Sequence, residues 1–139
     1  MKHSGGVEMF DDIIKFGRQM MIQGLNNSHS GNVSCRMKNA IHITRHGAQL
    51  GDLSHRDFVT VNLKDGKRDK GASIEVKVHR AIYLANPNIF AIIHAHPPCA
   101  IALSLNCQKI IPIDMEGKYY FQEVPVLSKC KEAISSDCV

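Results

Sequence analysis

The chain has 139 residues, of which 44% are hydrophobic and 22% are charged, and this size and composition predict one globular domain over residues 1–139. The net charge of +4 comes from 17 Lys and Arg residues that are scattered along the chain, so we expect no nucleic-acid partner. No apolar run approaches the length of a membrane span and the N-terminal segment lacks the apolar core of a secretion signal, which predicts a cytoplasmic protein without a membrane partner.

The first half of the chain predicts one helix followed by three strands. Apolar residues recur at helical spacing over residues 7–25, and the Gly- and Asn-rich segment that follows ends this helix. Segments 33–37 and 40–44 are typical of two short strands joined by a tight turn, and 58–63 alternates as a third strand. The glycine-containing and charged segments between these elements are expected to be loops.

The second half predicts a helix, a strand that carries two histidines, and smaller elements. Residues 73–85 have helical spacing, and 89–96 is an apolar, β-branched run that we interpret as a buried strand. Two prolines then introduce a short helix over 99–105. Segments 110–113 and 119–124 predict strands, and Ser128 could cap a last helix through Ile134. This alternation predicts a layered α/β domain whose sheet is at least partly antiparallel.

His94 and His96 stand two residues apart at the end of the predicted strand. Side chains two apart on a strand point to the same face, so both imidazoles would project together. Two neutral imidazoles suit a borderline ion such as zinc, and a catalytic zinc adds a third protein ligand and an open position. The alternative is a pair of histidines hydrogen-bonded to backbone, and the spacing alone does not choose between the two.

Glu75 lies near the start of the helix that precedes the histidine strand. A carboxylate at this position interacts favourably with the helix dipole, so a solvent-exposed surface glutamate is the simplest interpretation. His79 lies four residues on and therefore on the same helical face. A Glu-His pair so near a possible metal strand makes Glu75 a candidate, whereas His79 fits a helix-packing or supporting residue better than a ligand.

Two glycine-containing junctions are candidates for binding an anion. Gly31 permits close backbone approach, and Asn32 beside it can donate hydrogen bonds to a phosphate or carboxylate. Thr44 and Gly47 form a similar loop with a nearby hydroxyl. Each junction alone is also what an ordinary connection between a loop and a strand looks like.

Four motifs in order resemble the class II aldolase/adducin family, from the first helix to about residue 126: Gly31-Asn32-Val33-Ser34, Ile43-Thr44-Arg45-His46-Gly47, Ser73-Ile74-Glu75 with His79, and His94-Ala95-His96-Pro97. The resemblance implies a three-layer α/β/α fold around a largely antiparallel sheet. It also implies a homotetramer with active sites between subunits.

The resemblance further implies roles for individual residues. His94 and His96 would hold Zn²⁺ or another divalent ion, and Glu75 would be the catalytic acid/base. The substrate-binding residues would be Gly31, Asn32, Thr44, Gly47 and Ser73. The implied activity is aldol cleavage or condensation of a phosphorylated ketose, of the fuculose-1-phosphate aldolase type, which gives dihydroxyacetone phosphate and an aldehyde.

Other activities of the same family are alternatives: a sugar-phosphate 4-epimerase, a dehydratase, or a non-catalytic adducin-like assembly domain. Outside the family, a cupin would place a glutamate shortly after the two histidines, and the segment 97–104 contains none. An amidohydrolase barrel needs roughly 250 residues, well beyond this chain.

The sequence departs from the family pattern at three places. His46 stands where family enzymes often have a small hydroxyl residue, and Ile74 stands where a second serine often precedes the glutamate. The family's third zinc histidine lies in a Gly-His-Gly-like stretch beyond the last helix, and no histidine follows His96. We therefore expect a C-terminally shortened domain that holds zinc weakly, with its third ligand from water, Glu75 or a neighbouring subunit.

Overall fold

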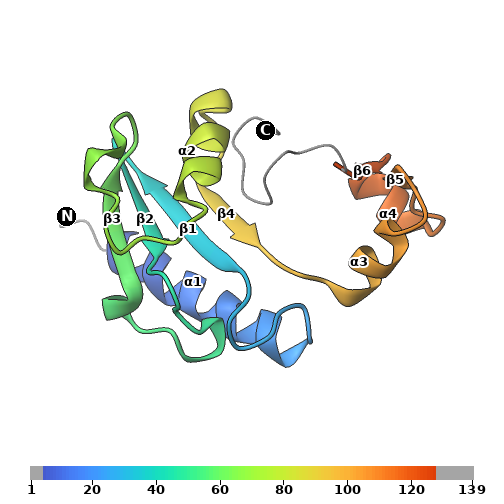
Figure 1. The fold of residues 1–139 in the computed structure, drawn as a ribbon, viewed down its shortest axis with the longest axis horizontal. Coiled ribbons are helices and arrows are strands. Elements are labelled where there is room, and N and C mark those ends of the chain that lie inside the picture. The colour runs from blue at the N-terminus through green and yellow to red at the C-terminus, as the bar shows by residue number, and fades with distance from the viewer. Residues whose placement is uncertain (1–4, 128–139) are drawn as a thin grey trace.

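The computed structural model describes residues 5–127, which form a four-stranded sheet with helices on both faces and a smaller C-terminal part (Figure 1). The strands are β1 (Asn32–Met37), β2 (Ala40–Thr44), β3 (Phe58–Asn62), β4 (Ala91–His94), β5 (Lys109–Ile110) and β6 (Val124–Pro125). The α-helices are α1 (Gly5–Ile22), α2 (Val76–Ala85), α3 (Pro98–Ser104) and α4 (Met115–Tyr120). Short 3₁₀ turns cover Leu50–Asp52, His55–Asp57 and Gly66–Arg68.

The main sheet has the order β3-β2-β1-β4, and every neighbouring pair of strands is antiparallel. In the β1–β2 hairpin, Ser34 lies opposite Ile43, and the turn depends on Lys38 in a left-handed conformation with φ of 55°. On the other side of β1, Asn32 lies opposite His94 of β4. The strands predicted in the first half of the chain are confirmed to within one residue at each end.

The two faces of the sheet carry separate hydrophobic cores, which confirms the predicted three layers. Because side chains alternate along a strand, Val33 and Cys35 of β1 face α1, while Ser34 between them faces α2. The core on the α1 side contains Ile13, Met20, Val33, Cys35, Ala48, Leu50 and Leu53. The core on the α2 side contains Ile41, Ile43, Val61, Leu63, Ala72, Val76 and Tyr83.

Helix α2 begins three residues later than the sequence pattern predicted. Ser73 stays outside the helix, where its Oγ accepts a hydrogen bond from the Glu75 backbone N–H at 3.3 Å. Glu75 occupies the residue immediately before the helix, with φ of −85° and ψ of 6°. The carboxylate therefore stands at the positive end of the helix dipole instead of within a helical turn.

The C-terminal part, residues 98–127, lies apart from the main sheet (Figure 1). Its first helix, α3, confirms the prediction for 99–105, but the strand predicted over 119–124 is wrong. That segment enters helix α4, because the Asp114 carboxylate accepts a hydrogen bond from the Gly117 backbone N–H at 2.7 Å and caps the helix. The helix predicted to start at Ser128 lies outside the described residues.

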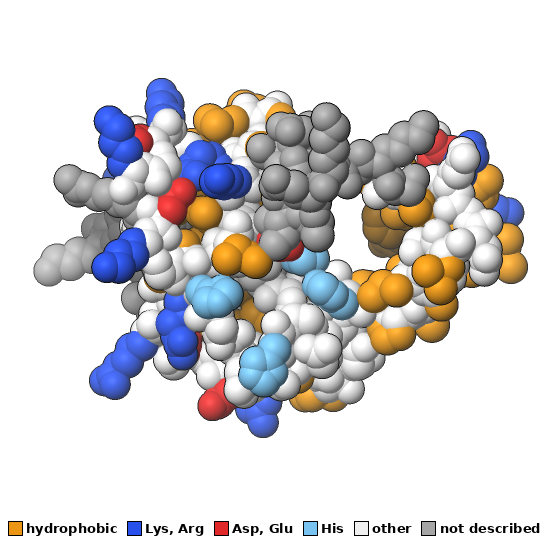
Figure 2. Space-filling view, viewed as in Figure 1, with side chains coloured by type: hydrophobic (Ala, Val, Ile, Leu, Met, Phe, Trp, Pro, Cys, Tyr) orange, Lys and Arg blue, Asp and Glu red, His pale blue; other side chains and the backbone are white. Residues whose placement is uncertain are grey.

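Apolar side chains on the C-terminal part are largely exposed. Ile113 is 90%, Met115 88% and Tyr119 83% exposed. Figure 2 shows hydrophobic side chains over this part of the molecule, whereas Lys and Arg gather at the opposite side of the same view. Among residues 5–127, no helix combines the length and apolar character that crossing a bilayer requires.

Candidate active site

A pocket of about 460 Å³ lies at the end of the sheet where β1 begins and β4 ends. Histidine side chains surround the middle of this face of the molecule (Figure 2). The structure brings together at the pocket wall all but one of the residues that the sequence singled out: Gly31, Asn32, Gly47, Ser73, Glu75, His94 and His96.

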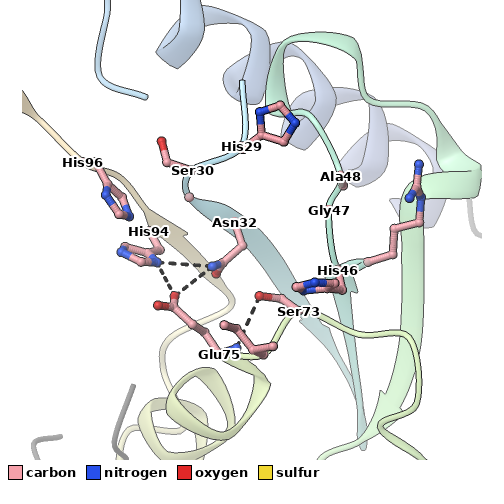
Figure 3. A pocket seen from close by; sticks show the side chains of 13 residues that line it. His29, Ser30, Asn32, His46, Gly47, Ala48, Ser73, Glu75, His94 and His96 are labelled. Atoms are coloured by element: carbon pink, nitrogen blue, oxygen red, sulfur yellow. Dashed lines mark hydrogen bonds and ion pairs between the residues drawn. The ribbon is translucent and has the colours of Figure 1, made fainter. Parts of the chain in front are cut away.

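Strand pairing explains why the candidate catalytic residues converge. Asn32 and His94 are opposite each other on β1 and β4 and project from the same face of the sheet. This is the face covered by α2, so Glu75 at the start of α2 meets both side chains (Figure 3). Three segments that are distant in sequence thus deliver an amide, a carboxylate and an imidazole to one point.

These three side chains are hydrogen-bonded to one another. The Asn32 amide nitrogen donates to Glu75 Oε2 at 2.8 Å and lies 3.2 Å from His94 Nδ1, and His94 forms an ion pair with Glu75. Burial raises the pKa of Glu75, but hydrogen bonds from His94 and Asn32 outweigh it, so that the pKa lies below its ordinary value. Glu75 is therefore ionised at neutral pH and able to accept a proton.

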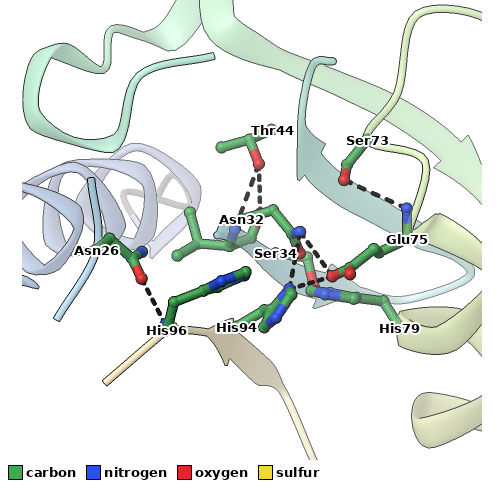
Figure 4. Close-up of polar contacts among 10 residues, drawn as sticks. Asn26, Asn32, Ser34, Thr44, Ser73, Glu75, His79, His94 and His96 are labelled. Carbon is green, nitrogen blue, oxygen red and sulfur yellow. Dashed lines mark hydrogen bonds and ion pairs between the residues drawn. The ribbon is translucent and has the colours of Figure 1, made fainter. Parts of the chain in front are cut away.

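His96 lies beside His94, with ring centroids 4.7 Å apart and ring planes inclined at 35°. Its backbone N–H donates both to the Leu25 carbonyl at 2.9 Å and to Asn26 Oδ1 at 2.7 Å (Figure 4). Sequence reasoning missed this function of Asn26, because it depends on a contact between residues that are 70 positions apart. Asn26 fixes the chain just where it leaves β4.

Gly31 is required at the point where the loop before β1 crosses β4. Its backbone is left-handed, with φ of 79°, and a Cβ there would lie 2.1 Å from Asn26 Nδ2 and 2.6 Å from the His94 carbonyl oxygen. Any side chain would therefore displace Asn26 or the histidine strand. The sequence singled out Gly31 for close backbone approach to a ligand. In the structure, the Gly31 backbone closely approaches Asn26 and His94 of the same chain.

A second polar group lies deeper on the same face. The Ser34 hydroxyl hydrogen-bonds to His79 Nδ1 at 2.7 Å and to the Tyr83 hydroxyl at 2.8 Å, and all three side chains are buried (Figure 4). Burial lowers the pKa of His79 to about 4 and raises that of Tyr83 to about 12, so both are neutral near pH 7. His79 thus packs α2 against β1, as the sequence predicted.

Thr44 is the exception among the predicted substrate-binding residues. It is 1% exposed and does not line the pocket, because its hydroxyl accepts from the Val33 N–H at 3.3 Å and donates to the Val33 carbonyl at 3.5 Å. Its carbonyl accepts from the Ser73 N–H at 2.9 Å and so joins two loops of the pocket. The structure therefore does not bring the Thr44 side chain to the pocket wall, and its hydrogen bonds support the loops that form that wall.

Three other wall residues, His29, Ser30 and Ala48, were not singled out by the sequence, whereas Arg45 and Ile74 belong to the motifs that carry the family resemblance. His29 belongs to the polar segment after α1, which the pattern marks only as a loop. His46, noted as a departure from the family pattern, also lines the pocket. Only the folded arrangement of three loops brings these side chains to one cavity.

The donor chemistry of the site fits two ligands of a borderline divalent ion. His94 and His96 supply neighbouring imidazoles, and Asn32 Oδ1 is buried without a hydrogen-bond partner in the described structure, which leaves an acceptor for a group bound beside them. Across residues 5–127, however, no three His, Cys, Asp or Glu side chains are arranged as a metal site. Among the described residues, His94 and His96 therefore provide only part of the ligand set that a divalent ion requires.

The chain is similar in sequence and fold to several known proteins. The solved structure of L-fuculose-1-phosphate aldolase from Thermus thermophilus superposes with a TM-score of 0.80 at 36% identity, over 86% of this chain and 61% of that chain. The L-fuculose phosphate aldolase of Methanococcus vannielii is 30% identical over 101 residues, which are 72% of this chain and 55% of that protein.

A methylthioribulose-1-phosphate dehydratase of Gluconobacter oxydans is 32% identical over 97 residues, which are 68% of this chain and 47% of that protein. The chain spans about half the length of the curated relatives it matches. The profile described as Class II Aldolase and Adducin N-terminal domain matches residues 11–136, nearly the whole chain. On this match the chain belongs to the class II aldolase and adducin family.

Proposed function

We propose that this chain supplies the catalytic pocket of a zinc-dependent aldolase that cleaves a phosphorylated ketose to dihydroxyacetone phosphate and an aldehyde. The observation that carries the proposal is the ionised Glu75 carboxylate, held by Asn32 beside His94 in a pocket that also contains His96. Relatives named as fuculose-phosphate aldolases support the substrate class.

Each side chain has a distinct task in this proposal. Glu75 moves a proton at the carbon next to the substrate carbonyl, which its lowered pKa suits because the base must be ionised at neutral pH. Asn32 keeps the carboxylate oriented through its 2.8 Å hydrogen bond. His94 and His96 would hold the divalent ion, which when bound supplies Lewis-acid polarisation of the substrate carbonyl.

The opposite side of the pocket would orient the substrate through its phosphate. Gly47 has a left-handed backbone with φ of 74° and open space around its Cα, so the loop can approach a ligand closely. Ser73 lines the pocket with its hydroxyl, and its loop is joined to that of Gly47 through the Arg45–Ala72 backbone bridge. Binding the phosphate here would hold the reacting carbons near Glu75.

A dehydratase is the second candidate, because the Gluconobacter oxydans relative is named for that activity at similar identity. At the carbon next to the carbonyl, Glu75 could return a proton to the enediolate that carbon-carbon cleavage leaves, or it could abstract the proton whose removal leads to loss of water. The same pocket therefore serves both reactions, and only the products distinguish them. A sugar-phosphate 4-epimerase would instead return an isomer of the substrate.

The test is to incubate the zinc-supplemented chain with phosphorylated pentuloses and deoxyhexuloses and to identify the products by mass spectrometry. Dihydroxyacetone phosphate together with an aldehyde supports the aldolase, and a product that keeps all its carbons but has lost water supports the dehydratase. Substrates that remain unchanged at every zinc concentration would contradict both and favour a non-catalytic assembly domain.

Metal binding is tested separately by measuring zinc content and affinity after dialysis. His94→Ala and His96→Ala should each reduce zinc retention at least about tenfold, because every ligand matters in a site that has few. His55→Ala is the matched control, since His55 is an exposed histidine that lies outside the pocket and bonds to Asp11 at 2.9 Å. Equal zinc content in all variants would remove the metal from the proposal.

We also propose assembly as a homotetramer with sites between subunits, as the family resemblance implies. The exposed apolar side chains of residues 98–127 support it, because surfaces of this kind are usually covered by another protein surface. Light scattering should then give a mass four times that of the chain, and a monomer at all concentrations would contradict the assembly.

A further inference from the structure

His96 lies beyond the end of the strand that places His94. Strand β4 ends at His94, whose partner in the register with β1 is Asn32. In the described part of the chain the next two residues, Ala95 and His96, have no partner in that register, yet the ring centroids of His94 and His96 are 4.7 Å apart. Strand pairing therefore explains the position of His94 and leaves that of His96 to other contacts.

The contacts that hold His96 come from the segment that follows α1. The His96 N–H donates to the Leu25 carbonyl at 2.9 Å and to Asn26 Oδ1 at 2.7 Å (Figure 4). One bond alone would let the backbone pivot about it, whereas two acceptors together fix the direction of the N–H group. Asn26 is 8% exposed, so bulk water does not reach this bond.

Asn26 also borders the backbone of His94. The Asn26 amide nitrogen and the His94 carbonyl oxygen both lie against Gly31, where a Cβ would be 2.1 Å from the nitrogen and 2.6 Å from the oxygen. The Asn26 nitrogen is buried, and within residues 5–127 it has no hydrogen-bond partner. A buried unpaired donor costs free energy, which an apolar side chain of similar size would avoid. What asparagine offers here, and an apolar side chain does not, is the oxygen that bonds to His96.

The two histidines are thus held by different parts of the chain. His94 Nδ1 lies 3.2 Å from the Asn32 amide nitrogen and pairs with Glu75, so contacts of its ring orient this histidine. The hydrogen bonds that hold His96 in the described residues are made by its backbone instead. The direction of the His96 imidazole therefore depends on where its backbone is anchored.

We propose that Asn26 is a positioning residue for the histidine pair: its side-chain oxygen holds the His96 backbone so that both imidazoles reach the same divalent ion. The inference rests on the proposed function for the ion, but not for the placement of His96, which the metal-free chain can test. Groups that support a metal ligand from behind change metal affinity roughly ten- to a hundredfold when they are removed. A link that only joined α1 to β4 would affect stability and leave the metal site unchanged.

The first measurement is metal binding by Asn26→Ala. Zinc affinity should fall about tenfold, and the visible absorption of the Co²⁺-loaded protein should change, because the bands of this ion depend on its coordination geometry. Asn62→Ala is the matched control: Asn62 Oδ1 accepts from the Lys64 N–H at 2.7 Å and the Asp65 N–H at 3.1 Å, and Asn62 does not line the pocket. The control should lose stability but keep the wild-type zinc affinity and cobalt spectrum.

The second measurement needs no metal. Hydrogen exchange in the metal-free wild type, followed by NMR, should show the His96 amide to be as protected as the Arg36 amide of β1, which donates to the Phe90 carbonyl at 2.8 Å. In Asn26→Ala the His96 amide should exchange about five- to tenfold faster, because one net hydrogen bond is lost, and the Arg36 amide should be unchanged. If Asn26→Ala does not fold, a rapidly exchanging His96 amide in the wild type would overturn the proposal, and a protected one supports it.

Wild-type zinc affinity and an unchanged cobalt spectrum in Asn26→Ala would overturn the positioning role. A wild type that binds no zinc would refute the metal in the proposed reaction, and the exchange of the His96 amide would then decide alone whether Asn26 places this histidine. Zinc binding by the wild type that is weakened in Asn26→Ala, without cleavage of any phosphorylated ketose, would refute the proposed reaction alone.

Discussion

On the α1 face of the sheet, Val33 and Cys35 belong to an apolar core, whereas Asn32 and Ser34 of the same strand carry hydrogen-bonding groups to the α2 face. Burial raises the pKa of the Cys35 thiol to about 11, so it is an unreactive part of the α1-side core. One strand thus contributes to a core on one side and to the candidate active site on the other.

The difference shows how a small domain can hold polar groups without losing its core. Buried polar atoms cost free energy unless they are paired, and Ser34 pairs with both His79 and Tyr83. The polar groups run along the α2 face and become partly exposed at Glu75 and His94, where the pocket begins. Stability should therefore respond to changes on both faces, and catalysis mainly to changes at the end of the α2 face.

The largest expected effect is on activity. Glu75→Gln should lower turnover of the phosphorylated ketose by about 10²- to 10⁴-fold, because glutamine keeps the shape and the bond from Asn32 but accepts no proton. The measurement is steady-state kinetics with zinc present, together with circular dichroism to show that the fold is retained.

The control for this prediction is Glu116→Gln. Glu116 is an exposed glutamate on α4 that does not line the pocket. This variant should keep wild-type turnover. If Glu75→Gln also keeps it, Glu75 is not the acid/base and the proposed reaction loses its central residue.

The second prediction concerns the α1 face. Leu50→Ala should lower the free energy of unfolding by about 2–5 kcal/mol, because Leu50 is 1% exposed and its truncation leaves a cavity against α1. Urea denaturation measures the change. Substrate affinity of the protein that remains folded should be unchanged, and a large change in affinity would show that the two faces are not separable.

The sequence predicted the strands of the main sheet, and the His94–His96 pair and Glu75 were singled out from spacing and position. The buried strand expected from the apolar run over 89–96 is wrong in part, because β4 covers only Ala91–His94 and lies at the sheet edge, where Ile93 is exposed. The sequence did not predict the positions of residues that depend on tertiary contacts. Asn26 holds His96 across the fold, and the buried position of Thr44 depends on its hydrogen bonds to β1. No local pattern contains either contact.

The wrong strand over 119–124 has a local cause. The aromatic residues of that segment favour strands in a propensity argument, but the Asp114 cap and Gly117 N–H start helix α4 before them. The pocket position of His29 was missed for a different reason, since a histidine in a polar loop gives no sign of which surface it faces.

The third prediction is a pH dependence of stability on the α2 face. Burial lowers the pKa of His79 to about 4 from 6.5, so between these pH values the unfolded chain binds a proton that the folded chain does not. Stability should therefore be lost as the pH falls through this window, by up to about 3 kcal/mol from this residue. His79→Asn, which can keep the bond to Ser34, should remove that part of the pH dependence.

The measurement is urea denaturation at several pH values between about 4 and 7, in the presence of a chelator so that metal binding does not contribute. Carboxylates other than Glu75, which interacts with His79, titrate alike in both proteins, so the difference between the two curves reports on His79 and its coupling to Glu75. Parallel curves for the wild type and His79→Asn would mean that His79 is not held neutral by burial.

The smallest expected effects separate the members of the buried polar group. Tyr83→Phe removes one hydrogen bond and leaves Ser34 paired with His79, so it should cost about 1 kcal/mol. Ser34→Ala leaves both His79 and Tyr83 without this partner and should cost more, about 1–3 kcal/mol. In the double variant the Tyr83 hydroxyl is absent when Ser34 is removed, so its cost should be less than the sum of the two single costs. Additive costs would show that the three side chains do not act as one group, and the α2 face would then differ from the α1 face only at the pocket.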